Sequence, residues 1–107
     1  MNQAFDGAKF SHEIDRYLNK ALEYKNFEPE MYRSYIIELL EEASLNKHLE
    51  SVASAIFSYS SKQKFIPYKL FKSSANEIEN EIDDLWLEEE YEDLTYSELI
   101  ETWLKKQ

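Results

Sequence analysis

The sequence predicts an all-α protein, a compact single-domain bundle of four to five main helices formed by residues 1–107. Three observations support this fold class. The chain contains one glycine and two prolines, so little interrupts helix formation. Apolar residues recur every three or four positions, which is the spacing of one helix face. A hydrophobic content of 43% supplies one core, and 107 residues are too few for a second.

The first half of the chain predicts three helices. The first covers residues 10–25 and has the apolar stripe Phe10, Ile14, Tyr17, Leu18 and Ala21. The second covers residues 29–44 and begins at Pro29. Proline suits the first turn of a helix, because the N–H group that it lacks would have no partner there. Asn46 is a suitable N-cap for the third. That helix would bury Leu49, Val52, Ala53, Ile56 and Phe57.

The second half predicts a connection followed by further helices. Residues 58–67 form the connection, and we expect a short helix to follow it through residues 68–71. Ser74 and Glu77 have capping-box spacing and predict the start of a fourth helix, which continues through the acidic residues 77–93. A second capping box, Thr95 with Glu98, predicts a terminal helix. Trp86 and Trp103 have the spacing of core residues, so we expect both to pack inside.

Charge is distributed in blocks along the chain, whose net charge is -10. Residues 1–50 hold ten acids and six bases, residues 51–76 hold four bases and no acid, and residues 77–107 hold twelve acids and two bases. The lysines of residues 62–72 alternate with aromatic residues, a composition seen in weak single-strand binders. In so acidic a chain we expect them instead to neutralise the acidic helix, or Glu38, Glu41 and Glu42.

The acidic segment 77–93 is the strongest candidate for a binding surface. As a helix it would place five like-charge pairs four residues apart, at a total cost of about 1–2.5 kcal/mol. A solvated face would tolerate this repulsion, and a cationic partner would offset it. The segment lacks the glycine and the ligand spacing of a calcium loop. We therefore expect a partner to contact Glu77, Glu81, Asp84, Glu88, Glu89, Tyr91, Glu92, Asp93 and Tyr96.

The composition also argues against several classes of function. Without cysteine there is no disulfide and no thiol chemistry, so we expect a cytoplasmic protein. The acidic balance disfavours direct binding to nucleic acid or to anionic membranes. His12 and His48 are the only imidazoles, and neither belongs to a catalytic or metal-binding motif. We predict no enzymatic activity, no metal and no cofactor.

Two groups of residues make the chain similar in general type to a known class of protein. They are the acids of residues 77–93 with Tyr91 and Tyr96, and the cluster Glu38, Glu41 and Glu42. With its size and lack of cysteine, the chain resembles the small acidic all-helical immunity proteins of bacteria, of the contact-dependent growth inhibition and colicin D types. The resemblance implies a protein that docks on a basic nuclease toxin, such as a ribonuclease, and neutralises it. The Tyr-Tyr-Pro stretch of colicin E immunity proteins is absent, so no residue roles are carried over.

Two other functions fit the same composition. One is a phage-type inhibitor whose carboxylates imitate nucleic acid and occupy a host protein that binds DNA or RNA. The other is a helical adaptor that binds its partner through an apolar groove. Salt dependence of binding separates the two charge-driven functions from the adaptor.

Overall fold

The computed structural model describes residues 5–60 and 63–107, and within these ranges it is helical without any strand. The all-α prediction is therefore confirmed. The helices are α1 (Gly7–Glu23), α2 (Pro29–Leu45), α3 (Leu49–Phe57), α4 (Ile66–Trp86) and α5 (Tyr96–Lys105), with a short 3-10 helix, η1, at Glu89–Tyr91.

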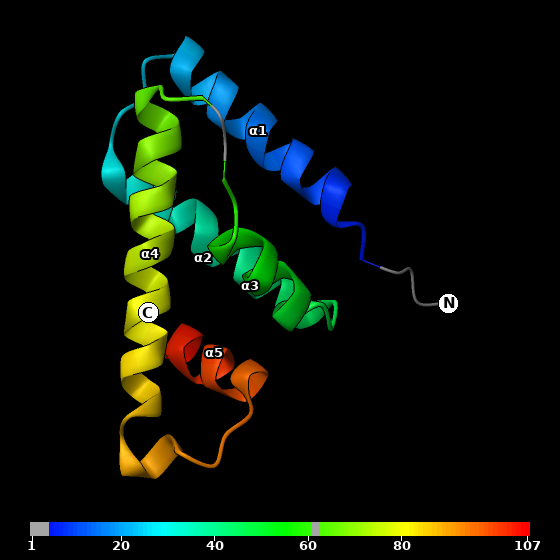
Figure 1. Ribbon diagram of the computed structural model, residues 1–107, viewed down its shortest axis with the longest axis vertical. Helices are drawn as coiled ribbons and strands as arrows, with labels where there is room; N and C mark the ends of the chain where they lie inside the picture. The colour runs from blue at the N-terminus through cyan, green and yellow to red at the C-terminus, as the bar shows by residue number, and fades with distance from the viewer. Residues whose placement is uncertain (1–4, 61–62) are drawn as a thin grey trace.

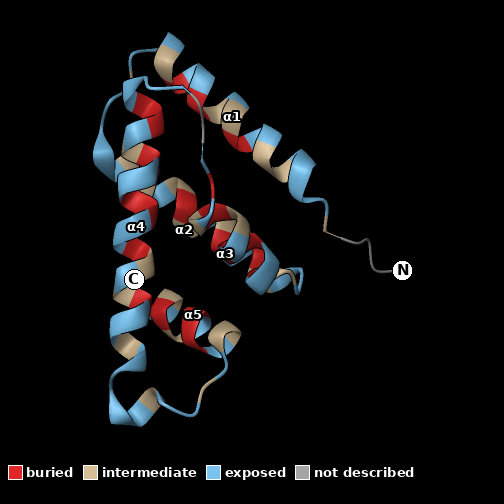
Figure 2. Cartoon of the chain, viewed as in Figure 1, coloured by how far each residue is buried: buried red, intermediate tan, exposed pale blue. Residues whose placement is uncertain are grey.

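Helix α4 organises the bundle. It is the longest helix and runs along one edge of the molecule in Figure 1, with α1, α3 and α5 to its right and α2 crossing behind it. It packs against α1, α2, α3 and α5. The buried stripes of the helices face one another, as Figure 2 shows, and their side chains form one hydrophobic cluster. Its fully enclosed members include Tyr32, Phe71, Ile14, Leu18, Ile36, Leu40, Ile56, Ile78, Ile82, Leu99 and Ile100.

Two of the predicted helix starts are confirmed. Pro29 occupies the first position of α2. At α5 the Glu98 amide donates to Thr95 Oγ1 at 3.2 Å, and the Thr95 amide donates to Glu98 Oε1 at 3.0 Å. This complete capping box satisfies two backbone N–H groups that the helix itself leaves unpaired. The turn from α4 into α5 therefore ends at a well-defined residue.

Two other predicted starts are wrong. Ser74 caps no helix; it lies inside α4, and only 4% of its surface is exposed. The short helix expected at residues 68–71 and the fourth helix are one continuous helix, since serine disfavours a helix interior only slightly. Asn46 is the C-cap of α2, and His48 precedes α3 without a side-chain capping bond.

The expected acidic helix over residues 77–93 is also wrong in its second half. Helix α4 ends at Trp86, and Glu88 to Asp93 lie in the turn that leads through η1 to α5. Of the five like-charge pairs, only 77/81 and 79/83 lie wholly inside α4. Carboxylates at the C-terminal end of a helix face the negative end of its dipole. Glu88 directly follows the C-cap Leu87 and therefore remains next to that end.

Candidate functional site

The acidic residues expected to bind a partner gather mainly at the C-terminal end of α4 and in the turn that follows. We call this surface the acidic apex. Figure 2 shows this end of α4 and the turn largely exposed. Every carboxylate of the apex is exposed: Asp83, Asp84, Glu88, Glu89, Glu90, Glu92 and Asp93. Of the predicted site residues it therefore brings together Asp84, Glu88, Glu89, Glu92 and Asp93.

Two apolar side chains are exposed among these carboxylates. Leu87 is 84% exposed and Trp86 is 43% exposed. The expected burial of Trp86 is therefore wrong, whereas Trp103 is buried as expected, with 3% of its surface exposed. Trp86 and Leu87 are the last residue and the C-cap of α4, where fewer neighbouring helices are available to cover them. Apolar periodicity does not reveal this, because it does not show where a helix outruns its neighbours.

Tyr96 lies between the hydrophobic core and the Trp86 side chain of the apex. Its ring lies 6.2 Å from the Trp86 ring, measured between centroids. It is partly buried against the core. Burial, followed by the nearby carboxylates Asp83 and Glu79, raises the pKa of Tyr96 to about 12. Tyr96 thus lies in a negative environment and positions the Trp86 ring beside it.

Tyr91 also has an internal neighbour. The ammonium group of Lys106 lies 5.5 Å from the centroid of the Tyr91 ring, a cation–π distance. A hydrogen bond with Tyr91, and then the charges of Tyr91, Glu88 and Glu90, raise the pKa of Lys106. The fold therefore places one cation, Lys106, next to the apex. Sequence reasoning missed this contact, because the lysine is fifteen positions away from Tyr91.

Glu81 lies in an internal network away from the exposed carboxylates. Both of its oxygens accept hydrogen bonds from Arg33 of α2, at 2.9 and 2.8 Å. The indole N–H of Trp103 in α5 donates to the same carboxylate at 3.2 Å. The Arg33 guanidinium also lies 5.6 Å from the Trp103 ring centroid. Glu81 therefore joins three helices, and its Arg33 contact holds its pKa below the ordinary value.

Glu77, one turn before Glu81, is exposed, and its charge contributes to the raised pKa of Arg33. The two carboxylates at 77 and 81 thus lie toward α2, whereas the apex carboxylates lie beyond the end of α4. The predicted nine-residue surface is therefore divided: Glu81 belongs to a partly exposed hydrogen-bond network between helices, Glu77 is exposed one turn before it, and the other seven residues lie from the end of α4 to the start of α5.

The expected neutralisation of acids by the lysines of residues 62–72 is not seen. In the part of the chain that the structure describes, the one ion pair is Arg33–Glu81. The Lys72 ammonium group donates to the backbone oxygen of Tyr59 at 3.2 Å, and Lys62 lies outside the described residues. The described lysines, Lys64, Lys69 and Lys72, are exposed. The acidic apex is thus left without compensation from this segment.

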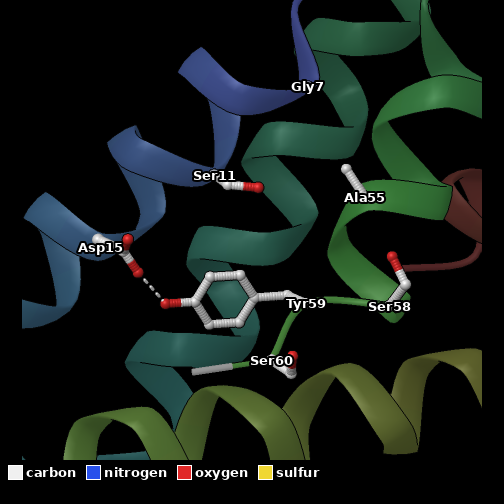
Figure 3. A pocket seen from close by; sticks show the side chains of 7 residues that line it. All are labelled: Gly7, Ser11, Asp15, Ala55, Ser58, Tyr59 and Ser60. Carbon is white, nitrogen blue, oxygen red and sulfur yellow. Dashed lines mark hydrogen bonds between the residues drawn. The ribbon is translucent and has the colours of Figure 1, made fainter. Parts of the chain in front are cut away.

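A second candidate site is a hydroxyl-lined cavity of about 530 Å³ (Figure 3). It is lined by Gly7, Ser11, Asp15, Ala55, Ser58, Tyr59 and Ser60. The Tyr59 hydroxyl points across the cavity and donates to the Asp15 carboxylate. Among the described residues that line it, there is no histidine or lysine that would activate a serine as a nucleophile. The described lining of the cavity therefore indicates no particular reaction, and the apex is the stronger candidate site.

Within residues 5–60 and 63–107, no group of three or more histidine, aspartate or glutamate side chains is arranged to hold a metal ion. None of the helices described there has the length and apolarity needed to span a bilayer.

No protein-family model, curated protein or solved structure matches this chain.

Proposed function

We propose that this protein is an immunity-type inhibitor that binds a basic nuclease toxin domain, a ribonuclease, through the acidic apex. One observation carries the proposal. Seven exposed carboxylates lie in the last turn of α4 and in the segment that follows it, on both sides in sequence of the exposed side chains of Trp86 and Leu87. A charged rim around an apolar centre is the usual composition of a protein-binding surface.

The carboxylates supply long-range attraction and selectivity. Lys106 is the one cation whose contact with the apex is described, against seven acids. The remaining repulsion is relieved when a cationic surface approaches, which accelerates association and makes it sensitive to salt. Nuclease active sites are cationic because they hold phosphate groups, so a carboxylate surface competes with the nucleic acid for them.

Trp86 and Leu87 supply the short-range part of the interaction. Large apolar and aromatic side chains at the centre of an interface carry most of its binding energy once water is excluded. Tyr91 and Tyr96 are partly buried and hold the surface in shape, the first beside Lys106 and the second beside Trp86. We therefore place the anchoring role on Trp86 and Leu87, with the two tyrosines as supports.

The proposal is tested by affinity capture from the source cell, followed by nuclease assays on the purified partner. The wild-type protein is compared with a variant in which Leu87 is replaced by serine. Leu45→Ser is the matched control, because Leu45 is 85% exposed at the end of α2. We expect inhibition to fall at least about 10-fold with Leu87→Ser and to stay unchanged with Leu45→Ser.

Other outcomes identify the alternative functions. A captured partner that binds nucleic acid without cleaving it would favour the nucleic-acid-mimic inhibitor. Binding that requires Leu87 but ignores salt would favour the apolar adaptor. A partner without a basic surface would refute the proposed class.

A further inference from the structure

Helix α4 carries charges that oppose its own dipole at both ends. Lys64 precedes its first turn and Lys69 lies in the next, while its first turn contains no acid. Its last turn contains Asp83 and Asp84 and no base. The N-terminus of a helix carries partial positive charge and the C-terminus partial negative charge. Each end of α4 therefore gathers charge of the sign that its dipole disfavours.

The two ends cannot compensate each other within one molecule. At 1.5 Å per residue, a helix of this length separates its ends by about 30 Å. Exposed charges are screened over about 8 Å at physiological ionic strength. The end of α1 lies near the start of α4 in Figure 1, but it brings one charge of each sign, Lys20 and Glu23. Within the molecule, Lys106 offsets only part of the charge at the apex, so the remaining relief has to come from another molecule.

Both ends of α4 also expose a pair of adjacent apolar side chains. At the start of the helix, Phe65 is 51% exposed and Ile66 is 49% exposed. At its end the corresponding pair is Trp86 and Leu87. We call the surface formed by Lys64, Phe65, Ile66 and Lys69 the basic end. The basic end and the acidic apex thus share an apolar centre and carry opposite flanking charges.

We propose that copies of this chain associate head to tail, with the basic end of one copy against the acidic apex of the next. The contact pairs lysines with carboxylates, covers both apolar pairs and brings helix ends of opposite dipole sign together. It joins two different surfaces, so it does not close on itself at two copies. Each patch has only two exposed apolar side chains, which makes the association weak and reversible. It occupies the apex, so self-association and binding of a basic partner exclude each other.

The test is sedimentation equilibrium of the full chain at concentrations of about 0.05–2 mM, a range set by the expected weak affinity. The buffer contains about 0.15 M salt, which screens the repulsion between copies of net charge -10. One variant disables the apex: Leu87→Ser with Glu88→Gln and Glu89→Gln. The other disables the basic end: Lys64→Gln with Phe65→Ser. Phe65 is the N-cap of α4, and serine is favoured at that position, so the second variant keeps the helix.

Wild type and the Leu45→Ser control should show a weight-average mass that rises with concentration and passes twice the monomer mass. Each disabled variant alone should remain monomeric. An equimolar mixture of the two should form pairs and stop there, because it has one intact apex and one intact basic end. A wild type that stays monomeric throughout, a disabled variant that associates like wild type, or a mixture that does not pair would each overturn the proposal. None of these outcomes depends on a nuclease partner.

Discussion

Replacing Glu81 with glutamine tests whether this carboxylate belongs to the scaffold. The substitution keeps the size of the side chain and removes its charge. Glu81 accepts two hydrogen bonds from Arg33 and one from Trp103, so it connects α4 with α2 and α5. Glutamine offers one oxygen in place of two, and its amide group opposes the donors of Arg33. We therefore expect the variant to be less stable than the wild type.

The magnitude follows from the exposure of the partners. The Arg33 side chain is 28% exposed and that of Glu81 is 43% exposed, so solvent screens the pair. We therefore assign it about 1 kcal/mol, the upper end of the range for exposed ion pairs. The indole hydrogen bond can be kept by the remaining oxygen of glutamine, so it adds nothing to this figure. A loss of about 1 kcal/mol lowers the melting temperature by about 4 °C in a domain of this size.

The assay is thermal unfolding followed by circular dichroism at a series of pH values. Arg33 holds the pKa of Glu81 below its ordinary value of 4.5. A carboxylate with a lowered folded-state pKa stabilises the protein above its unfolded-state pKa, and this stabilisation is lost as pH falls through the folded-state pKa. The difference between wild type and Glu81→Gln should therefore be full at neutral pH and should shrink below about pH 4.5.

Glu89→Gln is the control, because Glu89 is an exposed carboxylate of the apex. It removes the same charge from a crowded surface, so its stability should equal or slightly exceed that of the wild type. Equal stability of Glu81→Gln and Glu89→Gln at pH 7 would refute the scaffold role of Glu81. A pH-independent difference between Glu81→Gln and wild type would refute the electrostatic explanation.

Three further predictions concern the helices and the exposed tryptophan. Thr95→Ala should lower the free energy of unfolding by about 1 kcal/mol in denaturant titrations, because the α5 capping box loses an acceptor. Ser74→Ala should not lower the free energy of unfolding by the amount expected for a lost cap, since Ser74 lies inside α4. In a Trp103→Phe variant, fluorescence reports Trp86 alone, and its quenching relative to that of free tryptophan should be stronger with caesium than with iodide because exposed carboxylates lie near it in the chain. Equal quenching by both ions, or none, would contradict the described apex.

The helices themselves follow largely from local sequence. The stripe of α1, the proline that begins α2 and the capping box of α5 are short-range signals, and each agrees with the structure. The pattern at Ser74 and Glu77 is equally local, yet it lies inside a helix. A capping box indicates a start only where the preceding residues leave the helix. Residues 66–73 continue it instead, with Pro67 in the first turn.

The candidate site depended more on tertiary contacts. Its charge is visible in the sequence, but the separation of Glu81 from the apex is not, because Arg33 lies forty-eight positions away. The exposure of Trp86 and Leu87 depends on where α4 passes beyond the other helices. The same tertiary arrangement brings Lys106 to Tyr91. Sequence spacing therefore located the acidic surface, and packing decided which of its residues are available for binding.

The central claim is that the acidic apex binds a cationic protein, and the most direct measurement is the affinity of the purified partner across a salt series. The apex variant carries Asp84→Asn, Glu88→Gln and Glu89→Gln. The control removes the same number of charges from exposed residues of α2, with Glu38→Gln, Glu41→Gln and Glu42→Gln. Wild type and control should lose affinity steeply as salt rises, whereas the apex variant should bind at least about 10-fold more weakly at low salt and respond less to salt. Equal affinity and equal salt dependence for all three proteins would contradict the account.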